Sequence, residues 1–145
     1  MNPLSKLFTR LNAVLYQFTN GRLGSRMGAQ SVLLLRSIGR KSGKTYVTPI
    51  SFYRDGENYL VVASNWGSEK LPDWLQNLLV RPQAQIQVQA KTYRVSARLA
   101  DEAEQRRLWK LVTSRNPQFL EYQAQLKRRI PIVILEPEGE IGKRS

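Results

Sequence analysis

Residues 31–53 read SVLLLRSIGRKSGKTYVTPISFY and hold two apolar, strand-like runs on either side of a short basic turn. The runs extend from Ser31 to Arg36 and from Tyr46 to Tyr53, and the turn between them is IGRKSGKT, residues 38–45. Two glycines let the backbone turn sharply and come close to a ligand. This segment therefore predicts two strands joined by a tight cationic turn.

The turn carries groups that bind anions. Arg40, Lys41 and Lys44 surround backbone N–H groups and the hydroxyl of Ser42, an arrangement that suits phosphate or carboxylate oxygens. It is not a Walker loop, because the four-residue spacer after the first glycine is missing and a strand-like run follows where a helix is required. The alternative interpretation is a solvated hairpin turn with a basic tip.

Composition limits the chemistry that the chain can perform. It has 145 residues, enough for one domain with a buried core, and contains neither cysteine nor histidine. Thiolate nucleophiles, imidazole bases, Ser-His-Asp triads and zinc-finger sites are thereby excluded, and we expect no metal site. The 11 carboxylates form no recognisable catalytic pair. If the protein is an enzyme, we expect a bound organic cofactor to supply the reactive group.

The positive charge is concentrated in the first third of the chain. The net charge is +12, and residues 1–54 contain nine Lys and Arg but no Asp or Glu. We expect an anionic partner to meet this third, and nucleic acid, an anionic membrane surface and a polyanionic small molecule all satisfy the field. The alternative is that the charge serves solubility alone.

Hydrophobic periodicity predicts further strands after the first two. Residues 32–35, 59–63 and 132–135 are continuous apolar runs, typical of strands covered on both faces. Residues 84–89 and 92–99 alternate between apolar and polar side chains, which predicts a half-exposed hairpin. The pair Asp55-Gly56 is a turn signal, so the strands on either side of it should be antiparallel neighbours.

Three short helices are expected among the strands. The first runs from Pro72 to Val80, with Leu75, Leu78 and Leu79 pointing inward. Asp101 and Glu104 form a capping-box pattern for the second, and Asn116-Pro117 starts the third. Six mainly antiparallel strands with inserted short helices predict an α+β fold built on a small β-barrel.

Residues 1–20 predict an amphipathic helix, because apolar residues recur there at three- and four-residue spacing. Two interpretations are open for it: peripheral contact with an anionic membrane, or packing on the domain or on a partner. We expect residues 21–145 to form a single cofactor-binding barrel domain. No signal peptide or membrane-spanning segment is visible, so a cytoplasmic location is expected.

Short motifs recur along most of the chain in a characteristic order. They are residues 39–44 (GRKSGK), Thr48-Pro49, Asp55-Gly56, residues 62–67 (VASNWG), Lys70, Pro72, Trp74, Asn77-Leu78, Tyr122-Gln123, residues 129–133 (RIPIV) and residues 135–137 (LEP). In this order, from about Leu33 to Pro137, the chain resembles the deazaflavin-dependent nitroreductase family. The resemblance implies a split β-barrel like that of the FMN-binding reductases, which agrees with the six predicted strands.

The resemblance also implies a cofactor, coenzyme F-420, a deazaflavin that carries a ribityl phosphate and a polyanionic oligoglutamate tail. It places the phosphate and tail at the basic turn and the ring against a strand-end loop. The activity it implies is hydride transfer from C5 of the reduced deazaflavin to an electron-poor acceptor such as a quinone, an activated alkene or a nitro compound. The cofactor-binding residues it implies are Arg40, Lys41, Ser42, Gly43, Lys44, Thr48, Pro49, Ser64, Asn65, Trp66, Gly67 and Trp74.

Two departures from the family pattern concern the acceptor. Trp66-Gly67 stands where nitroimidazole-reducing members have a Gly-Gly pair, and Asn116, Phe119 and Tyr122 stand where they present three tyrosines. We therefore expect a quinone to be reduced faster than a nitroimidazole, with Tyr122 and Ser64 as candidate proton donors. Tyr122 has the alternative role of a core aromatic, since it lies at helical spacing from Phe119.

Three other functions remain open from the sequence. An FMN-binding reductase on the same barrel differs only in its cofactor. A nucleic-acid-binding module is favoured by the charge, but no recognition helix or aromatic sheet motif accompanies it. The third is a cofactor-free binding protein that keeps the barrel.

Overall fold

The segment that contains the basic turn forms two antiparallel strands in the computed structural model, which describes residues 26–27 and 30–142. β2 (Gln30–Ile38) pairs with β3 (Thr45–Ser51) along nearly its whole length. The turn is closed by bonds from Gly39 N to Lys44 O, 2.7 Å, and from Gly43 N to Gly39 O, 2.9 Å. Gly43 has a φ of +72°, a conformation that glycine adopts at little cost. The prediction of two strands joined by a tight turn is confirmed.

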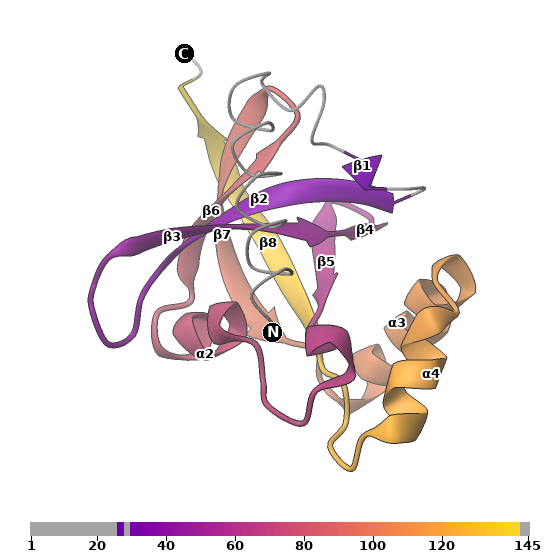
Figure 1. Ribbon diagram of the computed structural model, residues 1–145. Coiled ribbons are helices and arrows are strands. Elements are labelled where there is room, and N and C mark those ends of the chain that lie inside the picture. The colour runs from indigo at the N-terminus through magenta and orange to yellow at the C-terminus, as the bar shows by residue number, and fades with distance from the viewer. Residues whose placement is uncertain (1–25, 28–29, 143–145) are drawn as a thin grey trace.

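A bend after β3 curls the sheet into a split barrel (Figure 1). Only Phe52 separates β3 from β4 (Tyr53–Asp55), so one run of chain pairs first with β2 and then with β5 (Asn58–Val62). The Phe52 N–H donates to Ser31 O at 3.0 Å, which holds the bend against β2. The run 46–53, predicted as one strand, is therefore divided between two.

The rest of the barrel follows from β2, which also pairs with β6 (Gln83–Val88). β6 pairs with β7 (Lys91–Leu99), β7 with β8 (Ile132–Ile141), and β8 with β5, all antiparallel. β1 (Arg26–Met27) adds a short pairing at the start of β2. The six predicted strands are all present, and the predicted α+β fold on a small antiparallel barrel is confirmed.

β8 is longer than its apolar run, 132–135, predicted. It continues through Pro137 to Ile141, and its pairing with β7 shifts register between Arg94 and Val95. A proline lacks the backbone N–H that a regular ladder requires and is tolerated at such an irregularity. The predicted apolar run ends at Leu135, two residues before the proline, whereas the strand continues past Pro137 by means of the register shift.

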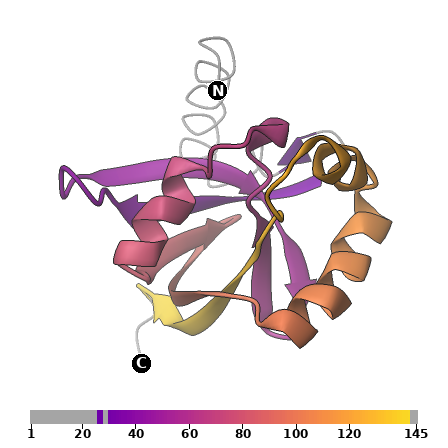
Figure 2. The ribbon, with the colours of Figure 1, turned by 90° about the horizontal axis from the view of Figure 1, so that it is seen from below.

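The core has two parts on opposite faces of β5 and β8. One fills the barrel interior and the other lies beneath α3 (Glu102–Arg115) and α4 (Gln118–Gln125), which flank the barrel in Figure 2. Neighbouring residues along β5 and β8 serve alternate parts, which explains why 59–63 and 132–135 are apolar throughout. The interior cluster includes Leu33, Leu35, Val61, Ile86 and Val133, and the outer cluster includes Leu60, Ile134, Leu108, Val112 and Phe119.

The predicted helices are confirmed with one correction. α2 (Asp73–Val80) follows Pro72 and packs Leu75 and Leu78 on the barrel interior, but Leu79 is 55 % exposed and the prediction that it points inward is wrong. Its place on the buried side of α2 is taken by Asn77, whose amide has a specific partner.

The two later helices begin where their caps were predicted. The capping box of α3 is present: Glu104 N donates to Asp101 Oδ1 at 2.9 Å, and Asp101 N donates to Glu104 Oε1 at 3.0 Å. α4 begins after Pro117.

The predicted N-terminal helix, residues 1–20, lies outside the described residues. Its contact with a membrane and the division of the chain at residue 20 stay predictions. Within 26–27 and 30–142, no helix is long and apolar enough to cross a membrane.

Arg98 connects the cap of α3 to β8. Its NH1 and NH2 donate to the two carboxylate oxygens of Glu104 at 2.7 and 2.8 Å, and its Nε donates to Glu136 at 3.0 Å. The Arg98 guanidinium, helped by the backbone N–H of Asp101, lowers the pKa of Glu104 to about 2. Folding therefore gains stability from this carboxylate only when it is ionised.

Replacing Glu104 with Gln should lower the free energy of unfolding at pH 7 by about 1 kcal/mol, because Gln keeps the capping geometry and loses the ion pair. Since the pKa of Glu104 in the folded chain lies below its ordinary value of 4.5, the difference should be full well above pH 4.5, shrink below that pH, and be lost as the pH falls through about 2. Urea denaturation across this range measures it. Glu138→Gln, at an exposed β8 position with no ion pair among the described residues, is the control. A difference that is as large at pH 2 as at pH 7 contradicts the assignment.

Candidate functional site

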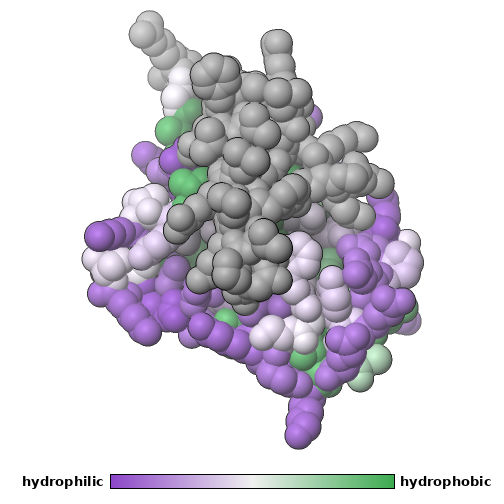
Figure 3. Space-filling model, in the orientation of Figure 1, coloured by the Kyte–Doolittle hydropathy of each residue, from purple (hydrophilic) through white to green (hydrophobic). Residues whose placement is uncertain are grey.

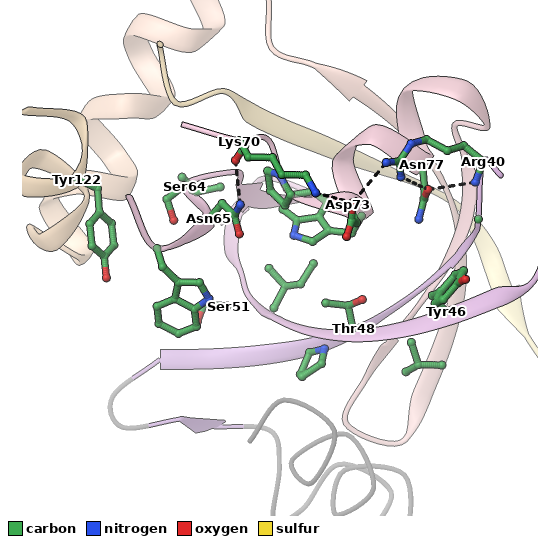
Figure 4. Close-up of a pocket in the computed structure, with 18 of the residues that line it drawn as sticks. Arg40, Tyr46, Thr48, Ser51, Ser64, Asn65, Lys70, Asp73, Asn77 and Tyr122 are labelled. Atoms are coloured by element: carbon green, nitrogen blue, oxygen red, sulfur yellow. Dashed lines mark hydrogen bonds and ion pairs between the residues drawn. The ribbon is translucent and has the colours of Figure 1, made fainter. Parts of the chain in front are cut away.

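A cleft of about 770 Å³ runs along one end of the barrel. It is bordered by the β2–β3 turn, by β3, by the loop after β5, by α2 and by the start of α4 (Figure 4). Arg40 and Tyr122 lie at opposite ends of it in this view. A cleft of this volume suits an organic ligand of cofactor size.

Most of the site residues predicted from the sequence are brought together here. Gly43, Lys44 and Gly67 are the exceptions, since they do not line the cleft. The predicted residues that line it are Arg40, Lys41, Ser42, Thr48, Pro49, Ser64, Asn65, Trp66, Trp74, Asn116, Phe119 and Tyr122.

Arg40 ties the basic turn to α2. Its backbone N–H and its NH1 both donate to Asn77 Oδ1, at 3.1 and 2.8 Å, and its NH2 lies 3.3 Å from Asp73 Oδ1. Asn77 is buried, whereas Asp73 is largely exposed. The guanidinium of Arg40 is therefore held in place by the scaffold, and only part of its donor set remains for a ligand.

The tip of the turn offers donors that have no partner within residues 26–27 and 30–142. Among the described residues, the Lys41 side chain and the backbone N–H groups of Lys41 and Ser42 have no acceptor, and both residues are exposed. The surface over this turn and α2 is largely hydrophilic (Figure 3). A cation beside successive free amides is a suitable site for phosphate or carboxylate oxygens.

Tyr46 lies across the turn and was not predicted as a site residue. A Cβ on Gly39 would lie 2.5 Å from Tyr46 Cε2 and 2.8 Å from Ser42 Oγ, so only glycine leaves room for the ring. The Tyr46 hydroxyl lies 3.2 Å from Ser42 Oγ. Tyr46 lies two residues before Thr48 on β3, so strand spacing places both side chains on one face of the strand. This spacing is the sequence signal that could have identified Tyr46.

α2 contributes a polar face that the sequence reasoning also missed. Asp73 and Asn77 line the cleft on either side of Trp74, which was predicted, and Lys70, just before the helix, lines it too, with its Nζ 3.8 Å from Asp73 Oδ1. Positions 70, 73, 74 and 77 follow helical spacing, so this face could have been found from the pattern. Gln118 of α4 also lines the cleft, and no sequence signal marks it.

The loop after β5 has an uncommon backbone. Asn65 and Trp66 have φ values of 48° and 58°, in the left-handed region, and Gly67 follows with φ of 80°. The short helix η1 (Asn65–Gly67) is formed by these residues. A Cβ on Gly67 would lie 3.0 Å from Cδ1 of Tyr122, so the loop lies directly against α4.

The side chain of Arg128 binds main-chain oxygens of this loop. Its side chain donates to Ala63 O at 3.1 Å, Ser64 O at 3.0 Å and Ser68 O at 2.8 Å. Burial lowers the pKa of Arg128, and within the described part of the chain its side chain donates to backbone carbonyl oxygens and to no carboxylate. No sequence signal marks this role, because Lys127-Arg128-Arg129 has the pattern of an ordinary solvated charge run.

The far end of the cleft holds the three predicted acceptor residues in different settings. Phe119 is 7 % exposed and packs edge-on against Tyr53, with ring centroids 6.1 Å apart, so most of its ring belongs to the core. Asn116 shares a hydrogen bond with Tyr53, and its Oδ1 accepts from Gln118 N at 3.2 Å. Among these three residues, only Tyr122 has a side-chain polar group without a hydrogen-bond partner in the part of the chain that the structure describes.

Tyr122 remains protonated at neutral pH. Burial, and then the charge of Glu121, raise the pKa of Tyr122 above its ordinary value of 10. Among the described residues, neither its hydroxyl nor that of Ser64 has a hydrogen-bond partner. Both hydroxyls are therefore available to a ligand in the cleft.

Fold and cleft together define a split-barrel protein with a cleft large enough for an organic cofactor. A solved F420-H2-dependent reductase matches with a TM-score of 0.67 and 32% identity, over 72% of this chain and 93% of that one. A solved chain described as a domain-swapped dimer matches with a TM-score of 0.70 and 28% identity, over 93% of this chain and 100% of that one.

Sequence comparison gives the family. An F420H(2)-dependent quinone reductase of Mycobacterium tuberculosis is 37% identical over 130 residues, which are 87% of each chain. The family model for the F420H(2)-dependent quinone reductases matches residues 8–137. The chain belongs to this family, which confirms the deazaflavin-dependent resemblance seen in the sequence.

Replacing Asn77 with Leu should lower the free energy of unfolding by about 1–3 kcal/mol, because the Arg40 N–H and guanidinium lose their shared buried acceptor. Asp73→Asn, which removes the exposed pairs of Asp73 with Arg40 and Lys70, should change it by less than about 0.5 kcal/mol. Chemical denaturation of both variants makes the comparison. Equal effects would mean that Asn77 does not fix the turn.

Proposed function

We propose that this protein oxidises reduced F-420 and reduces a quinone in the described cleft. The reduced deazaflavin supplies a hydride, which carries two electrons, and one proton completes the conversion of the quinone to its hydroquinone. The observation that carries the proposal is the difference between the two ends of the cleft. The turn offers donors for an anion, and the other end offers aromatic and hydroxyl groups. Membership of the quinone reductase family supports it.

The turn is the proposed site for the anionic end of the cofactor. Lys41 and the free amides of Lys41 and Ser42 suit the phosphate and the glutamate carboxylates. Arg40 adds its remaining N–H groups from a fixed position, because Asn77 and Asp73 hold the guanidinium. Lys44 lies outside the cleft and contributes only to the longer-range field.

The ring of the cofactor is proposed to lie against the wall formed by β3 and α2. Thr48 and Pro49 of β3 and Trp74 of α2 line the middle of the cleft, and Trp74 packs on the barrel core. A ring held here would meet an acceptor that enters from the end containing Ser64 and Tyr122. The residues would bind and orient both molecules and exclude water between them.

Tyr122 is the proposed proton donor to the quinone oxygen, with Ser64 as a second hydroxyl at the same end. The raised pKa of Tyr122 keeps it in the donating form throughout the neutral range. A nitro group would find only one phenol here, since Phe119 is mainly core and Asn116 is engaged by Tyr53. This setting favours a flat quinone over a nitroimidazole.

FMN is the alternative ligand for the same cleft. It has a single phosphate and no polyanionic tail, so it would use fewer of the donors at the turn. Reduced flavin and reduced deazaflavin both deliver a hydride, and the two are separated by binding measurements.

Lys41→Ala should weaken binding of F-420 about tenfold, because one charge-assisted contact to the anionic end is lost. Lys44→Ala is the matched control, since it removes the same charge from the same turn outside the cleft, and it should change affinity less than about threefold. Absorbance or fluorescence titration measures both, in parallel with FMN. Equal losses for the two lysines, or tighter binding of FMN than of F-420, would contradict the proposed site.

Tyr122→Phe should lower kcat for menadione by about tenfold and leave the affinity for F-420 within about threefold, because a proton donor is lost and the ring is retained. The kcat of the wild-type chain should stay level from pH 6 to 9, since the pKa of Tyr122 lies above this range. Steady-state oxidation of reduced F-420 measures both quantities. Ser64→Ala is the companion variant. A larger loss of kcat in Ser64→Ala than in Tyr122→Phe would make Ser64, and not Tyr122, the main proton donor.

A further inference from the structure

A tryptophan stands exposed at the acceptor end of the cleft. Trp66 lines the cleft, yet it is 61 % exposed. Trp74, the other indole in the cleft, packs against the barrel core instead. Because burial of a large aromatic side chain is favourable, an indole left in solvent beside a cleft marks a surface that a ligand can cover.

The backbone that presents Trp66 is unfavourable in isolation. Trp66 and Asn65 are consecutive non-glycine residues with positive φ. Clashes with Cβ make this region rare, above all for bulky side chains. A bulky residue persists there only where its surroundings fix it, and such positions cluster at ligand sites.

Three sets of bonds hold the conformation. Inside the loop, Gly67 N donates to Ser64 O and Ser68 N donates to Asn65 O, both at 3.0 Å. The Asn65 side chain donates to Lys70 O at 2.8 Å. Outside it, the guanidinium of Arg128 reaches the carbonyl oxygens at both ends of the turn, on Ala63, Ser64 and Ser68.

We infer that Trp66 selects the acceptor, as a platform on which a flat, fused-ring quinone stacks, and that Arg128 is the positioning residue that holds this platform in place. The inference rests on the proposed function, which brings a quinone to this end of the cleft. Trp74 forms the inner wall for the cofactor, and Trp66 meets the molecule that arrives from solvent. A fused-ring quinone covers more of the indole than a single-ring one, so the preference should follow ring size.

Binding without turnover is measured by NMR. The chain has three tryptophans, whose indole N–H signals report separately on Trp66, Trp74 and Trp109. With oxidised F-420 bound, added menadione should shift the signal of Trp66. Trp109, which packs in the cluster beneath α3, is the internal control and should not move. A Trp66 signal that responds fully to F-420 and not to menadione would overturn the inference.

Kinetics test the same residue. Trp66→Gly should raise KM for menadione about tenfold and Trp66→Phe about threefold, the scale of one aromatic contact. KM for 1,4-benzoquinone and for reduced F-420 should change less than about twofold. Glycine suits a positive φ, so the midpoint of thermal unfolding should not fall, and a loss of affinity is then not a loss of folding. Equal KM values for menadione in wild type and Trp66→Gly would overturn the inference.

Arg128→Lys tests the positioning role. Lysine keeps the charge and loses the planar fork that spans the three carbonyls. KM for menadione should rise as in Trp66→Gly, and combining the two changes should add less than about twofold. The matched control is Arg129→Lys, at a neighbouring exposed arginine paired with Glu102, which should leave KM unchanged. A lower thermal midpoint with an unchanged KM in Arg128→Lys would assign Arg128 to stability alone.

Failure of the inference is distinguishable from failure of the proposed function. If F-420 shifts none of the indole signals and reduced F-420 is not oxidised by any quinone, the proposed function fails and the inference falls with it. If reduced F-420 is oxidised by menadione while Trp66→Gly and Arg128→Lys behave as wild type, only the inference fails.

Discussion

The barrel depends on the bend at Phe52, where one run of chain passes from β3 to β4. Because the Phe52 N–H donates to Ser31 O, the run leaves β2 at a fixed point and continues beside β5. Two edges of the sheet are thereby joined. The basic turn that precedes β3 and the loop that follows β5 then border one cleft, although they are more than twenty residues apart in sequence. The site is a direct consequence of this closure.

Each end of the cleft is fixed by a polar side chain from an element packed behind it. At the cationic end, Asn77 of α2 accepts from Arg40 and sets the position of the turn. At the other end, Arg128 holds the carbonyl oxygens of the loop after β5. Both partners are largely shielded from water, where a hydrogen bond that is broken leaves an unpaired group and is therefore costly to lose. The two ends are thus presented by the scaffold rather than assembled by the ligand.

The fold was largely predictable because its signals are local. Apolar runs marked β5 and the start of β8, alternation marked β6 and β7, and the capping box marked the start of α3. The end of β8 was missed, since Pro137 interrupts the pattern, and Leu79 was misplaced because a buried amide, Asn77, occupies the position expected for an apolar side chain.

The site was predicted less completely, and two of its missing parts share a cause. The basic turn and the loop 64–67 were found from their residues, which carry the family resemblance. Asn77 and Arg128 were not assigned their roles, because their partners lie far away in sequence: 37 residues for Asn77 and about 60 for Arg128. Contacts of this kind exist only after the barrel has formed. Tyr46 and the polar face of α2 were missed although strand and helix spacing indicate them.

Arg128 donates to main-chain oxygens of the loop after β5, so these hydrogen bonds do not involve the loop's side chains. Every amino acid supplies the same carbonyl groups at positions 63, 64 and 68, so the bonds from the guanidinium do not depend on which side chain stands at position 66. Substitution at position 66 can then alter which molecules are accepted without rebuilding the framework around them. A scaffold of this kind lets substrate preference diverge quickly by single residue changes, while the barrel and the anion-binding turn stay as they are.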